Sequence, residues 1–267
     1  MKIIGEKING TRKEVGEAVL GRKTDFIREL ALSQVQAGAD LLDVNAGTPP
    51  DRETDDLVWL VRTIQEAVDI PLCLDSPNIS SLTAAASEVN HPPMINSING
   101  DPEKLERLLP LVRSNGCTVI ALALDEKGIP KDVQERMTVI RRVFKATREA
   151  GVSDENVYVD PLIMTISTNT NAGLTVLETM RTIRSEFPKA HITGGFSNIS
   201  FGLPGRVLIN RCFLTLVLEA GMDSAIIDPT RGDVYETLLA TEMLLGRDRF
   251  CRNYTLTYRS GRIPKKT

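Results

Sequence analysis

The chain has 267 residues, of which 42% are hydrophobic and 25% are charged, and its formal net charge is −3. This is the composition of a globular protein that can bury a core, and the slight negative charge gives no reason to expect a nucleic-acid partner. Met1 leads straight into a strand-like segment without a signal peptide, and no apolar run approaches the roughly 18 residues of a membrane span. We therefore expect a cytoplasmic protein with no membrane partner.

Short apolar runs alternate with segments of helical spacing along the whole chain. Strands are predicted at 2–8, 41–46, 72–76, 94–99, 118–125, 157–163, 191–198 and 224–230. Helices are predicted at 25–38, 55–68, 81–89, 102–116, 133–151, 174–187, 206–221 and 233–246. The strand runs are continuously apolar, which is typical of a parallel sheet that is covered on both faces.

Eight strand–helix units in a chain of this length predict an α/β fold, a (β/α)8 TIM barrel. A doubly wound open sheet is the alternative architecture. No linker rich in Pro, Gly or Ser divides the chain, so we expect one domain over residues 1–267. Residues 249–267 carry six basic and no acidic side chains, which predicts a solvated basic tail.

A carboxylate or an amide stands at the end of every predicted strand. Active sites of such barrels lie at these C-terminal strand ends. Any single Asp or Asn is also a good turn former or helix cap, but capping alone does not explain all eight ends. The residues are Glu6, Asn9, Asp43, Asn45, Asp75, Asn96, Asn99, Asp125, Asp160, Ser197, Asn198 and Asp228.

The strand-end residues together form a ring of acids and amides at one mouth of the predicted barrel, and their chemistry limits the class of ligand. Carboxylates accept hydrogen bonds, whereas amides both donate and accept them. The ring therefore favours a ligand with several N–H donors, such as a heterocycle with the 2-amino-4-oxo edge of a pterin. A phosphorylated sugar fits less well, because it calls for Arg, Lys or a glycine nest.

Other kinds of catalytic centre find little support in the sequence. The two histidines, His91 and His191, are predicted at the opposite end of the barrel, so a Ser or Cys nucleophile lacks its base. No metal-ligand spacing occurs, and we expect no metal site in this chain. Four widely spaced cysteines without a C-x-x-C motif are expected to be buried free thiols. They are Cys73, Cys117, Cys212 and Cys251.

Six strand-end motifs resemble one known family and occur in the same order. They are IIGEKIN (3–9), LLDVNAG (41–47), LCLDSPN (72–78), MINSIN (94–99), YVDPLI (158–163) and GGFSNISFGLPGR (194–206). The family is that of the pterin-binding methyltransferases, which includes the methyltetrahydrofolate:corrinoid protein methyltransferases and the folate domain of cobalamin-dependent methionine synthase. The resemblance extends from Lys2 to about Leu245.

The resemblance implies an enzyme that moves a methyl group between N5 of tetrahydrofolate and the cobalt of a corrinoid. Tetrahydrofolate or 5-methyltetrahydrofolate would be the substrate. Asn198 matches the asparagine that approaches N5 and is the expected catalytic residue, donating its amide N–H there. The other positions that match pterin-pocket residues are Asp75, Asn96 and Asp160, with Asp43, Asn45 and Ser197 lining the pocket.

Three further residues are weaker candidates for the site. Glu6 and Asn9 stand near the end of the first strand, and Arg206 follows the seventh, where it is expected near the glutamate tail of folate. Phe201 stands where the acetogenic corrinoid/iron–sulfur branch of the family carries Gln, and SFGLPGR is closer to the methionine synthase style. This departure leaves the identity of the corrinoid partner open.

The expected partners follow from the same resemblance. The chain has no D-x-H-x-x-G cobalamin motif, so the corrinoid is expected on a separate protein. The family implies a homodimer. Two alternatives stay open: a non-catalytic folate-binding barrel, which would not need Asn198, and dihydropteroate synthase. The synthase holds its substrates with Lys and Arg at the late strand ends, whereas the seventh strand here ends in Ser197 and Asn198.

Overall fold

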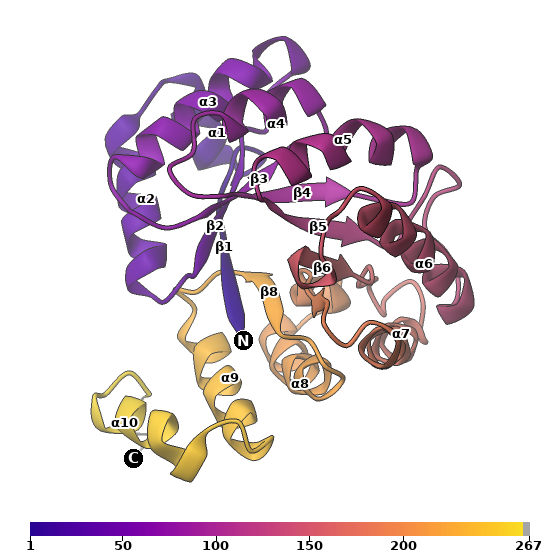
Figure 1. Ribbon diagram of the computed structural model, residues 1–267. Helices are drawn as coiled ribbons and strands as arrows, with labels where there is room; N and C mark the ends of the chain where they lie inside the picture. The colour runs from indigo at the N-terminus through magenta and orange to yellow at the C-terminus, as the bar shows by residue number, and fades with distance from the viewer. Residues whose placement is uncertain (264–267) are drawn as a thin grey trace.

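Eight parallel strands surround a common axis in the computed structural model, which describes residues 1–263 (Figure 1). They are β1 (Lys2–Asn9), β2 (Leu41–Asn45), β3 (Leu72–Asp75), β4 (Met94–Ile98), β5 (Thr118–Leu122), β6 (Val157–Asp160), β7 (His191–Ile192) and β8 (Ser224–Ile227). Their order around the sheet is β7-β6-β5-β4-β3-β2-β1-β8. This sequential order confirms the predicted (β/α)8 barrel and a single domain, and excludes the doubly wound alternative.

Helices follow every strand and cover the outside of the sheet (Figure 1). They are α1 (Lys13–Leu20), α2 (Thr24–Gln36), α3 (Pro50–Gln65), α4 (Ile79–Ala86), α5 (Pro102–Ser114), α6 (Val133–Glu149), α7 (Ala172–Glu186), α8 (Arg206–Glu219), α9 (Gly232–Leu244) and α10 (Arg252–Arg259). Two of these helices, α1 and α10, were not predicted from the sequence. In α1 the buried residues Val15, Ala18 and Val19 fall at helical spacing, but the segment is only eight residues long.

The predicted seventh strand is the largest error in the element boundaries. It was expected over 191–198, but β7 ends at Ile192 and a 3-10 turn, η2, spans Phe196–Ser200. Gly194 between them has φ +144°, a value that side-chain-bearing residues rarely adopt. The chain therefore leaves the extended conformation just where it reaches the mouth of the barrel.

The β7–β8 seam of the barrel is closed by two backbone hydrogen bonds and by the side chain of Asp223, not by a strand ladder. In the described part of the chain, β7 and β8 are linked by backbone bonds from Asp223 N to Ile192 O (3.2 Å) and from Ile226 N to Gly194 O (3.3 Å). The Asp223 carboxylate also accepts the Ile192 N–H at 2.9 Å and lies 3.0 Å from His191 Nδ1 and 3.2 Å from Arg184 Nη2. His191 is thus structural and lies at the N-terminal end of the barrel, as predicted.

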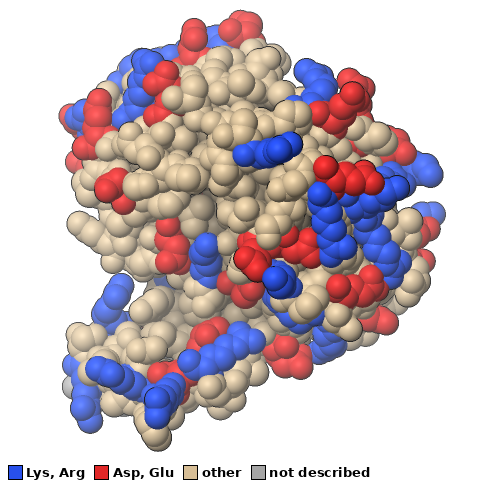
Figure 2. All heavy atoms as spheres, in the orientation of Figure 1, with Lys and Arg blue, Asp and Glu red and all other residues tan. Residues whose placement is uncertain are grey.

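The described part of the predicted basic tail, residues 249–263, lies on the outside of the barrel (Figure 1). A short 3-10 turn, η3 (Arg249–Cys251), leads into α10, and the Arg262 guanidinium stacks 5.0 Å from the Tyr235 ring centroid on α9. Basic side chains gather over this segment at the lower left of Figure 2. Lys265 and Lys266 lie outside the described residues.

Two of the four cysteines are not buried. Cys73 and Cys117 are buried as predicted, whereas Cys212 and Cys251 are exposed. Cys212 lies on the outer face of α8, and Cys251 lies in the exposed η3 turn, where no layer of the fold covers it. Among the described helices, none has the length and apolar character that a membrane crossing requires.

We predict that Asp223→Ala destabilises the protein by about 2 kcal/mol, because it leaves the buried Ile192 N–H without an acceptor. Burial opposes ionisation of Asp223, but hydrogen bonds from His191 and the Ile192 N–H, with the charges of His191 and Arg184, lower its pKa. The stabilisation is therefore present above the unfolded-state pKa of about 4 and is lost as the pH falls through the folded-state value. Denaturant unfolding between pH 3 and 7 measures both effects.

Asp69→Ala is the matched control, since Asp69 also pairs with a histidine, His91, at 2.6 Å, but on the surface. It is expected to change the free energy of unfolding by less than about 0.5 kcal/mol. Equal effects of the two substitutions would contradict the role of Asp223 at the seam.

Candidate functional site

The polar strand-end residues form a layer directly above an apolar plug inside the barrel. The plug takes one inward side chain from each of six strands: Ile4, Leu41, Cys73, Met94, Ile120 and Tyr158. Side chains two positions apart on a strand point to the same face. The next inward positions are Glu6, Asp43, Asp75, Asn96, Leu122 and Asp160. The strand register thus brings five of the predicted residues together.

Two amide–carboxylate pairs join β2, β3 and β4 at this level. Asn96 Nδ2 donates to Asp43 Oδ1 at 3.2 Å, and Asn45 Nδ2 donates to Asp75 Oδ2 at 2.8 Å. Each amide keeps an oxygen acceptor and a second N–H, and Asp75 keeps a second oxygen, whereas Asp43 also accepts a hydrogen bond from the Cys73 thiol. The cluster therefore presents both donors and acceptors toward a ligand.

Burial gives the carboxylates of this cluster unusual proton affinities. Asp43 is buried, and its removal from water together with the nearby charge of Asp75 raises its pKa to about 7. Burial also raises the pKa of Asp75, against the lowering effect of its hydrogen bond from Asn45. The pair is therefore able to hold or release a proton near neutral pH.

Asp160 stands across the barrel from these pairs, beside Gly194. Its Oδ1 accepts the Leu162 N–H at 2.8 Å, and burial raises its pKa to about 6. A Cβ on Gly194 would lie 3.1 Å from Asp160 Oδ1. Glycine is needed here because a larger residue would press on the carboxylate and would also be strained at this backbone conformation.

Asn198 lies on the η2 turn, exposed to solvent at the mouth. The turn is held from behind by Arg206, whose Nη2 donates to Ser197 O at 2.9 Å and whose Nε donates to Ser200 Oγ at 3.0 Å. Ser200 Oγ in turn lies 2.6 Å from Asn210 Oδ1. Arg206 thus supports the η2 turn. Its expected contact with the glutamate tail of folate stays a prediction.

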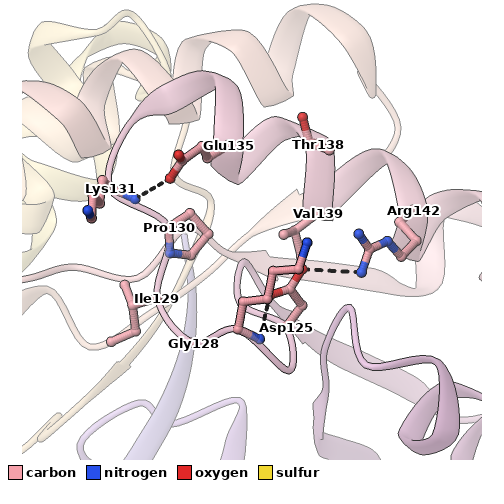
Figure 3. A pocket seen from close by; sticks show the side chains of 10 residues that line it. Asp125, Gly128, Ile129, Pro130, Lys131, Glu135, Thr138, Val139 and Arg142 are labelled. Atoms are coloured by element: carbon pink, nitrogen blue, oxygen red, sulfur yellow. Dashed lines mark hydrogen bonds and ion pairs between the residues drawn. The ribbon is translucent and has the colours of Figure 1, made fainter.

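Several strand-end residues stabilise turns instead of joining the cluster. The side-chain oxygens of Asn9, Asn99 and Asp228 accept backbone N–H groups two residues ahead, each at 3.0 Å. Asp125 does the same and also pairs with Arg142 at 3.2 Å, beside a separate pocket of about 340 Å³ between the 125–131 loop and α6 (Figure 3). These four follow the turn-forming explanation of Asx residues.

Three residues at the edge of the cluster carry further charge. Glu6 Oε1 lies 2.9 Å from Arg12 Nη2, and burial raises the Glu6 pKa while Arg12 opposes that rise. Buried Glu53 accepts the Ser76 hydroxyl at 2.5 Å, and the charges of Glu53 and Lys104 act on Asp75 in opposite directions. Glu53 and Lys104 were not predicted from the sequence. Their signal is a proline at the first position of α3 and α5, which marks a helix whose first turn adjoins the mouth.

A family profile described as pterin-binding enzyme matches residues 5–228, well over half of the chain. The chain belongs to the pterin-binding enzyme family. This confirms the resemblance seen in the strand-end motifs. The acids and amides described above therefore occupy the mouth of a pterin-binding barrel.

Curated relatives within this group extend the comparison. The pterin-binding chain is 39% identical over 265 residues to the methylcorrinoid:tetrahydrofolate methyltransferase of Eubacterium limosum, with 98% of each protein covered. It is 29% identical over 242 residues to the methionine synthase of Mycobacterium tuberculosis, which covers 86% of this chain and 20% of that protein. The match to methionine synthase is thus to one part of a much longer polypeptide.

Solved structures of pterin-binding relatives share the fold. The dihydropteroate synthase of Yersinia pestis superposes with a TM-score of 0.70 at 17% identity, over 92% of this chain and 93% of that one. The dihydropteroate synthase of Xanthomonas albilineans gives 0.67 at 16%, over 91% and 92%. At these identities the likeness establishes the barrel and nothing finer.

We predict that Asp43→Asn raises the melting temperature at pH 8 and changes it little at pH 5. The raised pKa means that the folded protein binds more protons than the unfolded chain between about pH 4 and pH 7, so wild-type stability falls as the pH rises through that window. The new amide is neutral and keeps an oxygen for the Asn96 N–H. Thermal unfolding at the two pH values measures the difference.

Asp55→Asn, at an exposed position on α3, is the control. Its melting temperature is expected to differ from that of the wild type by the same small amount at both pH values. A melting temperature for Asp43→Asn that is lower than that of the wild type at pH 8 would contradict the buried, proton-binding Asp43.

Proposed function

We propose that this enzyme transfers a methyl group between N5 of tetrahydrofolate and the cobalt of a corrinoid carried on a separate protein. The observation that carries the proposal is the cluster of paired acids and amides at one barrel mouth. The Eubacterium limosum relative, 39% identical over nearly its whole length, bears the name of this reaction. A donor-rich pterin edge suits such a cluster, since each free carboxylate oxygen accepts an N–H.

Within this proposal the deepest residues bind the pterin ring. Asp75, Asn96 and Asp160 hydrogen-bond the ring, while Asp43 and Asn45 line the pocket and hold Asn96 and Asp75 through the two pairs described above. Ser197 lines the pocket on the η2 side. Glu6 and Asn9, both on β1, form its edge, where each already bonds within the protein.

The chemistry assigns different tasks to Asn198 and Asp43. In the direction that the relative's name gives, the N5 lone pair forms the bond to the methyl carbon, the cobalt–carbon bond breaks with both electrons going to cobalt, and N5 then loses its proton. We propose that the Asn198 side-chain oxygen accepts the N5–H, a hydrogen bond that strengthens as N5 gains positive charge in the transition state. Asp43, whose pKa is raised to about 7, exchanges that proton with solvent, by way of a water in the cluster.

The proposed partners approach two different surfaces. The corrinoid protein covers the mouth, where Asn198 is exposed. A second copy of the chain covers the outer wall at α7 and α8, where an apolar groove of about 410 Å³ includes the exposed side chains Leu174, Leu208 and Leu216. This groove lies beside the mouth and contains no charged side chain, so a dimer formed there leaves the axis of the barrel free.

We place the enzyme in the cytoplasm, without nucleic-acid or membrane partners.

Asn198→Ala is predicted to bind tetrahydrofolate within tenfold of wild-type affinity and to lose methyl transfer by roughly 10²–10³, the typical cost of removing one preorganised hydrogen-bonding group. The cobalt absorption change after mixing methylcob(III)alamin with tetrahydrofolate measures the rate. Asn115→Ala, at an exposed helix end away from the mouth, is the control. Wild-type transfer by Asn198→Ala would contradict the catalytic role and favour a different N5 contact.

For the dimer, Leu208→Asp is predicted to convert the protein to a monomer without lowering its melting temperature by more than a few degrees, because Leu208 is exposed in the single chain. Light scattering after size-exclusion chromatography gives the mass. Leu244→Asp on α9 is the matched control, since Leu244 is equally exposed but lies outside the groove. A wild-type monomer, or equal dissociation by the control, would contradict this interface.

A further inference from the structure

Arg136 is a buried cation that lies directly behind the turn after β6. It belongs to the first turns of α6, and its side chain is 3% exposed. Its Nη1 donates to Pro161 O at 2.7 Å and to Leu162 O at 3.1 Å. Within residues 1–263, its Nε finds no hydrogen-bond partner. A buried guanidinium held mainly by two carbonyl groups is unusual, because buried charges are normally paired.

The two carbonyl groups belong to the segment that holds Asp160 in place. Leu162 has φ +65°, a left-handed conformation that a leucine adopts only when its surroundings impose it. In this conformation the Leu162 N–H donates to Asp160 Oδ1 at 2.8 Å. A continuous chain of contacts therefore runs from Arg136 through the Pro161–Leu162 turn to the Asp160 carboxylate.

We propose that Arg136 is a positioning residue for Asp160: its guanidinium clamps the Pro161–Leu162 turn, and its positive charge keeps the Asp160 carboxylate an ionised acceptor. The identity of the ligand that Asp160 accepts from rests on the proposed function. An ionised carboxylate accepts N–H donors with both oxygens, whereas a protonated one loses part of that capacity.

Arg136 is the charged group that stabilises the ionised form of Asp160. Burial raises the pKa of Asp160, and the Leu162 N–H and the Arg136 charge lower it again. The inward neighbours on either side are Leu122, its partner on β5, and Gly194 after β7, and neither titrates. Asp132, at the start of α6, favours the charged form of Arg136 itself.

The direct test is the titration of Asp160 in the ligand-free protein, followed by carbon NMR of labelled aspartate. Asp160→Asn assigns the signal by removing it. We expect a wild-type midpoint near the pKa of about 6 that the structure gives. Arg136→Gln and Arg136→Met are expected to raise the midpoint by about one pH unit or more, because an opposite charge is lost. Arg136→Lys keeps the charge and is expected to stay close to the wild type.

Arg142→Met is the matched control, since Arg142 also lies on α6 and donates to a backbone carbonyl, Gly100 O, but faces Asp125. It is expected to leave the Asp160 midpoint unchanged. An unmoved midpoint in both neutral Arg136 variants, or an equal shift in the control, would overturn the proposal. If the methionine variant does not fold, the glutamine variant, which keeps donors for the two carbonyls, decides alone.

The second readout is the dissociation constant of tetrahydrofolate as a function of pH. Because only the ionised Asp160 binds, a one-unit rise from a pKa of about 6 is expected to weaken tetrahydrofolate binding by Arg136→Gln about twofold at pH 7 and nearly tenfold at pH 5. The affinity is expected to match that of the wild type at pH 8.5. Equal weakening at every pH would mean a merely structural role and would overturn the proposal. Wild-type protein that binds no tetrahydrofolate would instead contradict the proposed function, and the ligand-free titration would still test Arg136.

Discussion

The burial of carboxylates at the ends of β2, β3 and β6 is the constraint on which the rest of the mouth depends. A carboxylate removed from water is costly unless hydrogen bonds or opposite charges compensate. Here two asparagine amides donate hydrogen bonds to Asp43 and Asp75. Asp160 accepts a backbone N–H and is stabilised in its charged form by Arg136. The compensation is incomplete, as the raised pKa values of all three show. A ligand that brings N–H donors would complete it.

The barrel supplies this arrangement through ordinary strand geometry. A two-residue step along each strand separates the apolar plug from the polar layer, so the same register that packs the interior also positions the acids. The strained end of β7 has a related origin. Because the strand stops at Ile192, Gly194 passes close to Asp160 and the η2 turn carries Asn198 to the mouth. At the other end of the seam, the Asp223 carboxylate bonds to His191 and to the Ile192 N–H and so replaces the missing ladder hydrogen bonds.

The repeating strand–helix units of the fold could be predicted from the sequence. Eight apolar runs followed by helical segments are enough to indicate the barrel, and the acids and amides at the strand ends indicated its functional face. The strand-end pattern alone did not separate Asp160 from Asp125, because both follow apolar strands and both accept an N–H two residues ahead. Only the family resemblance singled out Asp160. What distinguishes them is the inward direction of Asp160 and the arginine pair of Asp125, and both depend on packing between distant segments.

Other features were beyond the sequence for similar physical reasons. Arg136 is an ordinary residue of an amphipathic helix until α6 packs against the turn after β6. Arg206 was expected to contact the ligand because it ends the motif at the seventh strand, but the direction of its side chain depends on the hydrogen bonds that fold η2. The exposure of Cys212 depends on which face of α8 meets the barrel, and an almost uniformly apolar helix does not reveal that face.

The central claim is that this barrel mouth exchanges a methyl group between folate and cobalt. The most direct measurement is the cobalt absorption spectrum of two mixtures, methylcob(III)alamin with tetrahydrofolate and cob(I)alamin with 5-methyltetrahydrofolate, each with the purified protein. The account predicts enzyme-dependent formation of cob(I)alamin in the first mixture and of methylcob(III)alamin in the second. Spectra that do not change in either mixture would contradict it.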